Sequence, residues 1–140
     1  MRIGNRTSRE RLTTDDKQML LKRFPDIELS YDNILHKKVY ADLYMVQPKG
    51  ARAFLWFTYF KDKNVCIVLE LNKKGNIKSL EIYPACFDTV LSYGTLLLGT
   101  FFDIDNKYYF AAEDVFVYKG DNVSSKLLHD KLAILKNMFN

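Results

Sequence analysis

The sequence predicts an α+β domain in which a mainly antiparallel sheet carries helices at both ends. Residues 39–118 contain runs rich in aromatic and β-branched side chains, separated by short polar, glycine or proline turns. Short connections between consecutive strands favour antiparallel pairing. The two ends of the chain instead carry helix-capping residues and apolar side chains at helical spacing.

Composition is typical of a folded protein. The 140 residues are 48% hydrophobic and 27% charged, which predicts one domain and excludes a wholly disordered chain. Apolar runs are too short to span a bilayer, so no membrane partner is expected. The two cysteines make no disulfide framework. We expect a protein of the cytoplasm or nucleus, and the net charge of +4 mildly favours an anionic partner.

The first residues are unusually basic. Residues 1–12 hold four of the six arginines and few apolar side chains, which predicts a flexible basic arm before a single domain at 13–140. Thr13 or Thr14 then caps a short helix that Pro25 ends. The expected buried side of this helix comprises Met19, Leu20, Leu21 and Phe24.

The rest of the chain alternates strands and turns. A short helix is expected at 31–36 and a strand at 39–46, followed by a turn at 47–50. Further strands are expected at 51–60, 65–71, 77–83, 95–103 and 108–118, with a short helix at 85–92. A last helix, capped by Ser124 or Ser125, has an apolar stripe of Leu127, Leu128, Leu132, Leu135, Met138 and Phe139.

Residues that carry catalysis are scarce. His36 and His129 are the only histidines, and no nucleophile is placed beside either, so both are interpreted as surface residues. Cys66 and Cys86 are interpreted as small core residues. Asp103 and Asp105 flank an expected hairpin loop and are interpreted as turn residues rather than metal ligands. The sequence therefore predicts no metal and no cofactor.

The strand at 51–60 is rich in aromatic residues on both faces. Phe54, Trp56 and Phe60 share one face, whereas Phe57 and Tyr59 share the other. Packing in a core covered on both sides is the favoured interpretation. The alternative is an exposed platform on which bases stack.

The order of short motifs resembles the nucleotidyltransferase domain of mRNA capping guanylyltransferases, which is also the domain type of ligases. The segment 47–52, Gln-Pro-Lys-Gly-Ala-Arg, stands where the family has Lys-x-Asp-Gly-x-Arg before an apolar strand. The segment 94–100, Gly-Thr-Leu-Leu-Leu-Gly-Thr, looks like the family's Thr-Leu-Leu-Asp-Gly-Glu motif. The segment 109–120 is similar to the strand that follows. The resemblance covers residues 24–136 and implies that Gly50 and Gly99 lie in two neighbouring turns.

Departures from the family pattern remove its chemistry. Gln47 occupies the place of the lysine that becomes guanylylated, and an amide is no comparable nucleophile. Lys49 replaces an aspartate, and it is too far along the strand to act as a displaced nucleophile. Leu98 and Thr100 replace acidic residues of the second motif. The later motifs and the OB-fold lid have no counterpart in this sequence.

The resemblance implies an inactive domain that binds a nucleotide, an RNA 5′ end or a cap. The cap-binding domain of snurportin is a similar case, in which a guanylyltransferase-like domain lacks the chemistry. Gln47 and Thr100 would then line the pocket, while Lys49 and Arg52 would contact phosphates. An aromatic residue would stack on the base. The candidates are Trp56, Tyr83 and Tyr93.

Two other functions remain open from the sequence. The chain is alternatively a docking or structural subunit, of viral type, that uses the decayed fold to hold a protein partner or a second copy. A half-domain would leave sheet edges and an amphipathic helix in need of such partners. The third alternative is a transferase completed by another chain, against which Gln47 argues.

Overall fold

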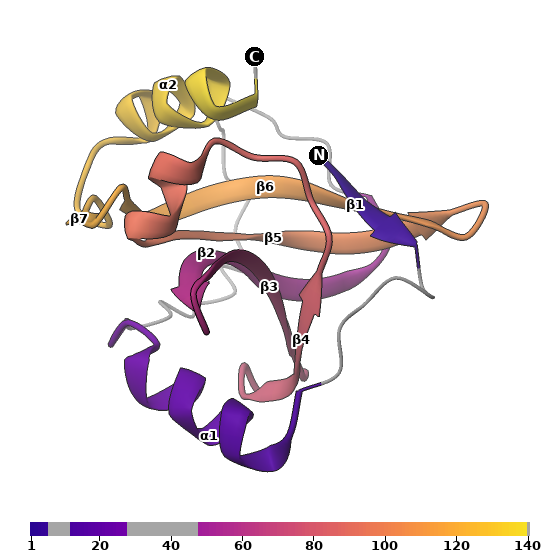
Figure 1. The fold of residues 1–140 in the computed structure, drawn as a ribbon. Coiled ribbons are helices and arrows are strands. Elements are labelled where there is room, and N and C mark those ends of the chain that lie inside the picture. Colours follow the sequence, from indigo (N-terminus) through magenta and orange to yellow (C-terminus); the bar gives the residue numbers. More distant parts are fainter. Residues whose placement is uncertain (6–11, 28–47, 140) are drawn as a thin grey trace.

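The computed structural model describes residues 1–5, 12–27 and 48–139, and these form one antiparallel sheet with helices on both sides (Figure 1). The strand order is β1-β6-β5-β2-β3-β4, and β7 pairs with β6. The strands are β1 (Arg2–Asn5), β2 (Ala51–Phe60), β3 (Lys63–Leu71), β4 (Ile77–Tyr83), β5 (Thr95–Ile104), β6 (Lys107–Tyr118) and β7 (Asp121–Asn122). The helices are α1 (Thr14–Arg23), the 3₁₀ helix η2 (Thr89–Tyr93) and α2 (Leu128–Phe139). The predicted α+β class is confirmed.

The hairpin turns follow from residues that tolerate positive φ. Asp105 and Asn106 adopt φ values of 52° and 65° between β5 and β6. Asp105 is therefore a turn residue, as the sequence predicts, whereas Asp103 lies within β5 and pairs with Tyr108 of β6. Lys61 and Asp62 make the same kind of turn between β2 and β3, with φ values of 48° and 61°.

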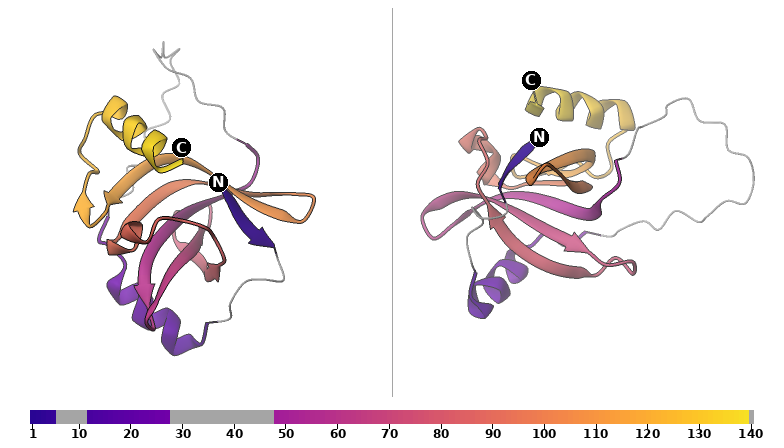
Figure 2. Two further views of the ribbon diagram at one scale, coloured as in Figure 1. Left: turned by 45° about the horizontal axis from the view of Figure 1, so that its top comes forward. Right: turned by 90° about the vertical axis from the view of Figure 1, so that its right-hand side faces the viewer.

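The sheet has two faces, and each face has its own core of buried side chains. The inner face carries alternate residues of β2, and its core includes Ala53, Leu55 and Phe57. The outer face carries the other residues of β2, and its core includes Phe54, Trp56 and Phe60. Core packing of the aromatic strand is therefore confirmed. Helix α2 and η2 pack on the inner face, and α1 lies on the outer face (Figures 1 and 2).

The sheet curls around its inner face. Tyr83 on β4 contacts Tyr108 on β6, with ring centroids 5.5 Å apart, although three strands lie between β4 and β6 in the sheet. Small side chains at the centre make this approach feasible, because Ala53 and Gly99 face each other across β2 and β5. The curl converts the inner face into a hollow.

Helix α1 begins as the sequence predicts. Thr13 and Asp16 form a capping box, in which the Asp16 amide donates to Thr13 Oγ1 at 3.1 Å and the Thr13 amide donates to Asp16 Oδ2 at 3.2 Å. Lys61 lies 3.0 Å from the other Asp16 carboxylate oxygen. The hydrogen bond from Lys61, followed by those from Thr13, holds the pKa of Asp16 below its ordinary value.

Several expectations are wrong in detail. The predicted basic arm includes β1, because Ile3 is fully buried and its neighbours pair with β6. On α1, Leu20 is buried but Met19 and Leu21 are exposed, since only one narrow side of this helix meets the sheet. The predicted helix at 85–92 is η2, whose start is fixed by Asp88 accepting from the Val90 amide at 3.1 Å.

The solvent exposure of Cys86 and of the first apolar residues near α2 also differs from the prediction. Cys86 is exposed, because it lies in the loop after β4 rather than in a strand. Helix α2 buries Leu135, but Leu127 lies before the helix and is exposed, as is Leu128. The expected helix at 31–36 and strand at 39–46 lie outside the described residues, as do His36 and Gln47.

Candidate functional site

The two glycine segments of the predicted site lie on neighbouring strands. Gly50 precedes β2, and Ala51 pairs with Phe101 of β5. Gly99 pairs with Ala53 in the same ladder, so it belongs to a strand and not to a turn. A Cβ atom at Gly99 would collide with the Ala111 carbonyl oxygen, and a Cβ atom at Gly50 would collide with that of Phe101. Close backbone approach therefore requires both glycines.

A cavity of about 450 Å³ opens on the inner face beside Gly50, and we call it the Lys49 cavity. Its floor and walls come from the start of β2, from β3 and β4, and from the β5–β6 hairpin. The residues that line it are Lys49, Gly50, Ala51, Glu70, Ser79, Glu81, Tyr83, Phe101, Phe102, Asp103, Asn106 and Tyr108. The volume is within the usual range of small-ligand sites.

Three aromatic rings form one wall of the Lys49 cavity. Tyr83, Phe101 and Tyr108 lie with ring centroids 4.9–5.5 Å apart. Tyr83 and Phe101 are buried, whereas Tyr108 is half-buried. Tyr108 is therefore the ring of this group that is best placed to contact a ligand.

The charges in the Lys49 cavity are mainly negative. Among the described residues that line it, Glu70, Glu81 and Asp103 are accompanied by one cation, Lys49, which is exposed. The Tyr83 hydroxyl donates to Glu81 Oε2 at 3.0 Å, which orients that carboxylate. An interior with excess carboxylates favours a ligand group that donates hydrogen bonds or carries positive charge, and it disfavours a buried phosphate.

Arg52 does not join Lys49. Its side chain lies on the outer face, where Nη1 donates to Glu113 Oε2 at 3.1 Å. Glu113 is the extra residue of a bulge in β6, because Gly99 pairs with Ala112 and Leu98 pairs with Asp114. The predicted phosphate contact from Arg52 in the same pocket as Lys49 is therefore wrong.

Three other predicted site residues also lie outside the cavity. Thr100 pairs with Arg52 and is 2% exposed. Trp56 is 3% exposed, and its ring packs edge-on against Phe24 at 5.4 Å, so it offers no face for a base. Tyr93 is 77% exposed at the end of η2, where it lines none of the Lys49 cavity. Tyr83 is the one aromatic candidate that reaches this cavity.

Sequence reasoning missed the acidic lining. Glu70, Glu81 and Asp103 are acidic residues at inner-face positions, a face that also carries the buried Cys66, Val68 and Phe101. The signal is present in the alternation, because Glu70 follows Cys66 and Val68 at every second position. The same rule separates Arg52 from the cavity, because its neighbour Ala51 lines the cavity and successive residues of β2 lie on opposite faces.

In the part of the chain that the structure describes, the other reactive side chains are not assembled into a site. Cys66 is buried in the inner core, as predicted, and burial raises the pKa of its thiol, so it stays protonated. His129 is exposed on α2 and lies 3.1 Å from Asp130, its chain neighbour. Within residues 1–5, 12–27 and 48–139, no group of three histidine, cysteine or acidic side chains could hold a metal ion.

Comparisons with known proteins give one viral similarity. No protein-family model matches the chain. The uncharacterized protein L308 of Acanthamoeba polyphaga mimivirus is 30% identical over 101 residues, which cover 69% of this chain and 31% of that protein. The chain therefore spans about a third of the length of the curated relative it matches. In the part of the chain that the structure describes, no helix is long and apolar enough to cross a membrane.

Proposed function

We propose that this chain is a catalytically inactive guanylyltransferase-like domain that binds a nucleotide, an RNA 5′ end or a cap in the Lys49 cavity. The main support is the pairing of β2 with β5, which puts the Gly50 and Gly99 segments on neighbouring strands, together with the aromatic cavity that opens beside Gly50. The similarity to a mimivirus protein supports a viral setting for this function.

The base enters the cavity and the phosphates stay at its mouth. Guanine carries an exocyclic amino group that donates hydrogen bonds, and Glu70, Glu81 and Asp103 supply acceptors. Tyr108 provides an aromatic surface for the base. Lys49 is exposed at the rim, where its ammonium group can contact a phosphate without being buried among the carboxylates.

Charge favours a cap over an unmodified nucleotide. Methylation at N7 gives guanine a positive charge, which is attracted both to the carboxylates and to the faces of aromatic rings. Binding proceeds without group transfer, because the position of the family's nucleophilic lysine is Gln47. Incubation with labelled GTP and Mg²⁺ should leave no covalent adduct on the protein.

Calorimetric titration tests the proposal. We expect N7-methyl-GTP to bind more tightly than GTP, and GTP more tightly than ATP. Lys49→Ala should weaken binding of N7-methyl-GTP by about 1.5–3 kcal/mol, the usual value of a hydrogen bond to a charged group. The matched control is Lys73→Ala, which removes an exposed lysine from the β3–β4 turn. Equal affinity for the three nucleotides, or equal loss in both variants, would contradict the proposal.

A further inference from the structure

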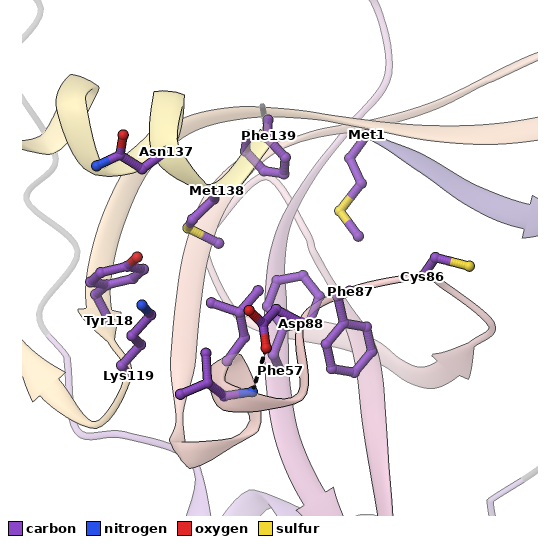
Figure 3. A pocket seen from close by; sticks show the side chains of 12 residues that line it. Met1, Phe57, Cys86, Phe87, Asp88, Tyr118, Lys119, Asn137, Met138 and Phe139 are labelled. Carbon is purple, nitrogen blue, oxygen red and sulfur yellow. Dashed lines mark hydrogen bonds between the residues drawn. The ribbon is translucent and has the colours of Figure 1, made fainter.

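A second hollow lies on the inner face, between the end of α2 and the segment that leads into η2 (Figure 3). We call it the α2 hollow, and its volume is about 550 Å³. Met138 projects from α2 toward Phe57, and Phe87 stands at the opposite side. Polar groups of Asn137 and Lys119 line it as well. The α2 hollow therefore offers both aromatic surface and hydrogen-bonding groups to a ligand.

A smaller hollow lies between the α2 hollow and the Lys49 cavity. Its volume is about 440 Å³, and we call it the β4 hollow because it follows the end of that strand. The β4 hollow shares Tyr83 with the Lys49 cavity and Phe87 with the α2 hollow. The Phe87 ring is half-buried and packs on Phe57, with ring centroids 4.7 Å apart. The three hollows therefore follow one another, with an aromatic ring at each of the two junctions.

The charge changes sign between the Lys49 cavity and the other two hollows. Three carboxylates and one lysine line the Lys49 cavity in the described chain. In the β4 hollow, the charged side chain among the described lining residues is that of Lys63. The α2 hollow has two cations, Lys119 and the Met1 ammonium group, and one carboxylate, that of Asp88, which caps η2. The hollows beyond Tyr83 therefore favour an anion, whereas the Lys49 cavity disfavours one.

Two of these cations are accessible to a ligand from solvent. The Met1 ammonium group is partly buried and donates to the Phe110 carbonyl oxygen at 3.0 Å, and burial lowers its pKa. Lys119 is exposed, and its ammonium nitrogen lies 4.9 Å from the centre of the Tyr118 ring. Lys63 is exposed at the start of β3. A phosphate can therefore approach Lys63 in the β4 hollow and Lys119 in the α2 hollow.

We propose that an RNA strand bound by its 5′ end in the Lys49 cavity continues across the β4 hollow to the α2 hollow. Its phosphates lie against Lys63 and Lys119, and one base stacks on the Phe87 ring. Single-stranded nucleic acid is generally bound in this way, by cations that follow the backbone and by aromatic rings on which bases stack. This inference rests on the proposed function, because the bound 5′ end is the start of the path.

Fluorescence polarisation tests the path on the full chain. The probe is an RNA hexamer with an N7-methylguanosine cap and a 3′ fluorescein label, and unlabelled N7-methyl-GTP is measured by displacement. We expect the capped hexamer to bind about tenfold more tightly than N7-methyl-GTP, the usual contribution of one stacked base. Two additional phosphate contacts should make the plot of log affinity against log salt concentration steeper, by about 1.4 in slope.

Substitution of the two lysines identifies the path. The double variant Lys63→Ala and Lys119→Ala should lose most of the tenfold gain and the additional salt dependence, and it should bind N7-methyl-GTP like the unmodified chain. The matched control is the double variant Lys73→Ala and Lys136→Ala, which removes two exposed lysines that line none of the three hollows. Phe87→Leu should also reduce the gain. Circular dichroism checks the folding of each variant, and if Phe87→Leu is unfolded, the lysine variants decide.

The failure of the path and the failure of the proposed function give different results. A capped hexamer that binds no more tightly than N7-methyl-GTP, or a gain that the Lys63 and Lys119 double variant retains, would overturn the path and leave the cap site in place. An uncapped hexamer that binds as tightly as the capped one would also overturn it, since the strand would not start in the Lys49 cavity. Failure of N7-methyl-GTP itself to bind would contradict the proposed function, on which the path depends.

Discussion

The two faces of the sheet use the same strands in opposite ways. The outer face fills its space with large rings, as where Phe54 packs against Phe24 and Phe116 at 5.5 and 5.9 Å, and Leu20 of α1 is fully buried there. The inner face instead has Ala53 and Gly99 at its centre, and two hollows open on it, the Lys49 cavity and one beside the end of α2. The two faces of β2 therefore differ in side-chain size, and the Lys49 cavity opens on the face that carries Ala53.

This division separates stability from binding. Substitutions on the outer face should affect unfolding and leave ligands alone, whereas substitutions at the inner hollows should do the reverse. Alternation along a strand makes the separation sharp, because neighbouring residues of β2 belong to different faces.

Trp56→Ala gives the largest expected effect. Trp56 is buried against Phe24 on the outer face, so its loss leaves a cavity and should lower the free energy of unfolding by about 3–5 kcal/mol. Urea denaturation followed by circular dichroism measures it. Tyr59→Ala, a half-exposed ring on the same strand, should change stability by about 0.5 kcal/mol or less. Similar losses in both variants would break the comparison between faces.

Gly99→Ala tests the crowding between β5 and β6. The added methyl group would meet the Ala111 carbonyl, which is backbone and cannot rotate away. We expect a loss of about 1–3 kcal/mol in the free energy of unfolding. Thermal denaturation gives the measurement, and Ser125→Ala at an exposed position is the reference. An unchanged melting temperature would mean that the strands separate more easily than the close approach implies.

Asp16→Asn gives a pH-dependent effect at the edge of the outer face. The native pKa of Asp16 is lowered, mainly by the hydrogen bond from Lys61, so its carboxylate stabilises the fold above the pKa of the unfolded chain. This contribution disappears as the pH falls through the lower native pKa. The variant should therefore have a lower melting temperature than the unmodified chain at pH 7. The difference in melting temperature should disappear at acidic pH. A difference in melting temperature that does not change with pH would contradict a stabilising role for the Asp16 charge.

Arg52→Ala has the smallest expected effect. Its ion pair with Glu113 is on the outer face and the Arg52 side chain is 52% exposed, so the loss should be about 1 kcal/mol or less. Affinity for N7-methyl-GTP should stay unchanged, in contrast to Lys49→Ala. A loss of affinity in both variants would show that the outer face takes part in binding.

The sequence predicted the elements well wherever local rules apply. The bounds of β2 and β4 match, and the cap of α1 at Thr13 follows from its side chain. The arm was mispredicted because the pairing of Arg2–Asn5 with β6 joins residues about a hundred positions apart, which no local pattern reveals.

The site was predicted only in part, for a similar reason. Lys49 and Tyr83 were identified, and they meet in one cavity because the sheet curls. The carboxylates of Glu70 and Glu81 were missed, since their convergence depends on that curvature. The positions of Arg52 and Trp56 could have been predicted, because alternation along β2 assigns both to the face opposite Ala51, which lines the cavity.

The contact between Tyr83 and Tyr108 makes the Lys49 cavity a product of bending rather than of a loop. A ligand bound between β4 and the β5–β6 hairpin therefore opposes flattening of the sheet. Its binding should stabilise the strands from β4 to β6. Amide hydrogens of β4, remote from Lys49 along the chain, should exchange more slowly once the cavity is occupied.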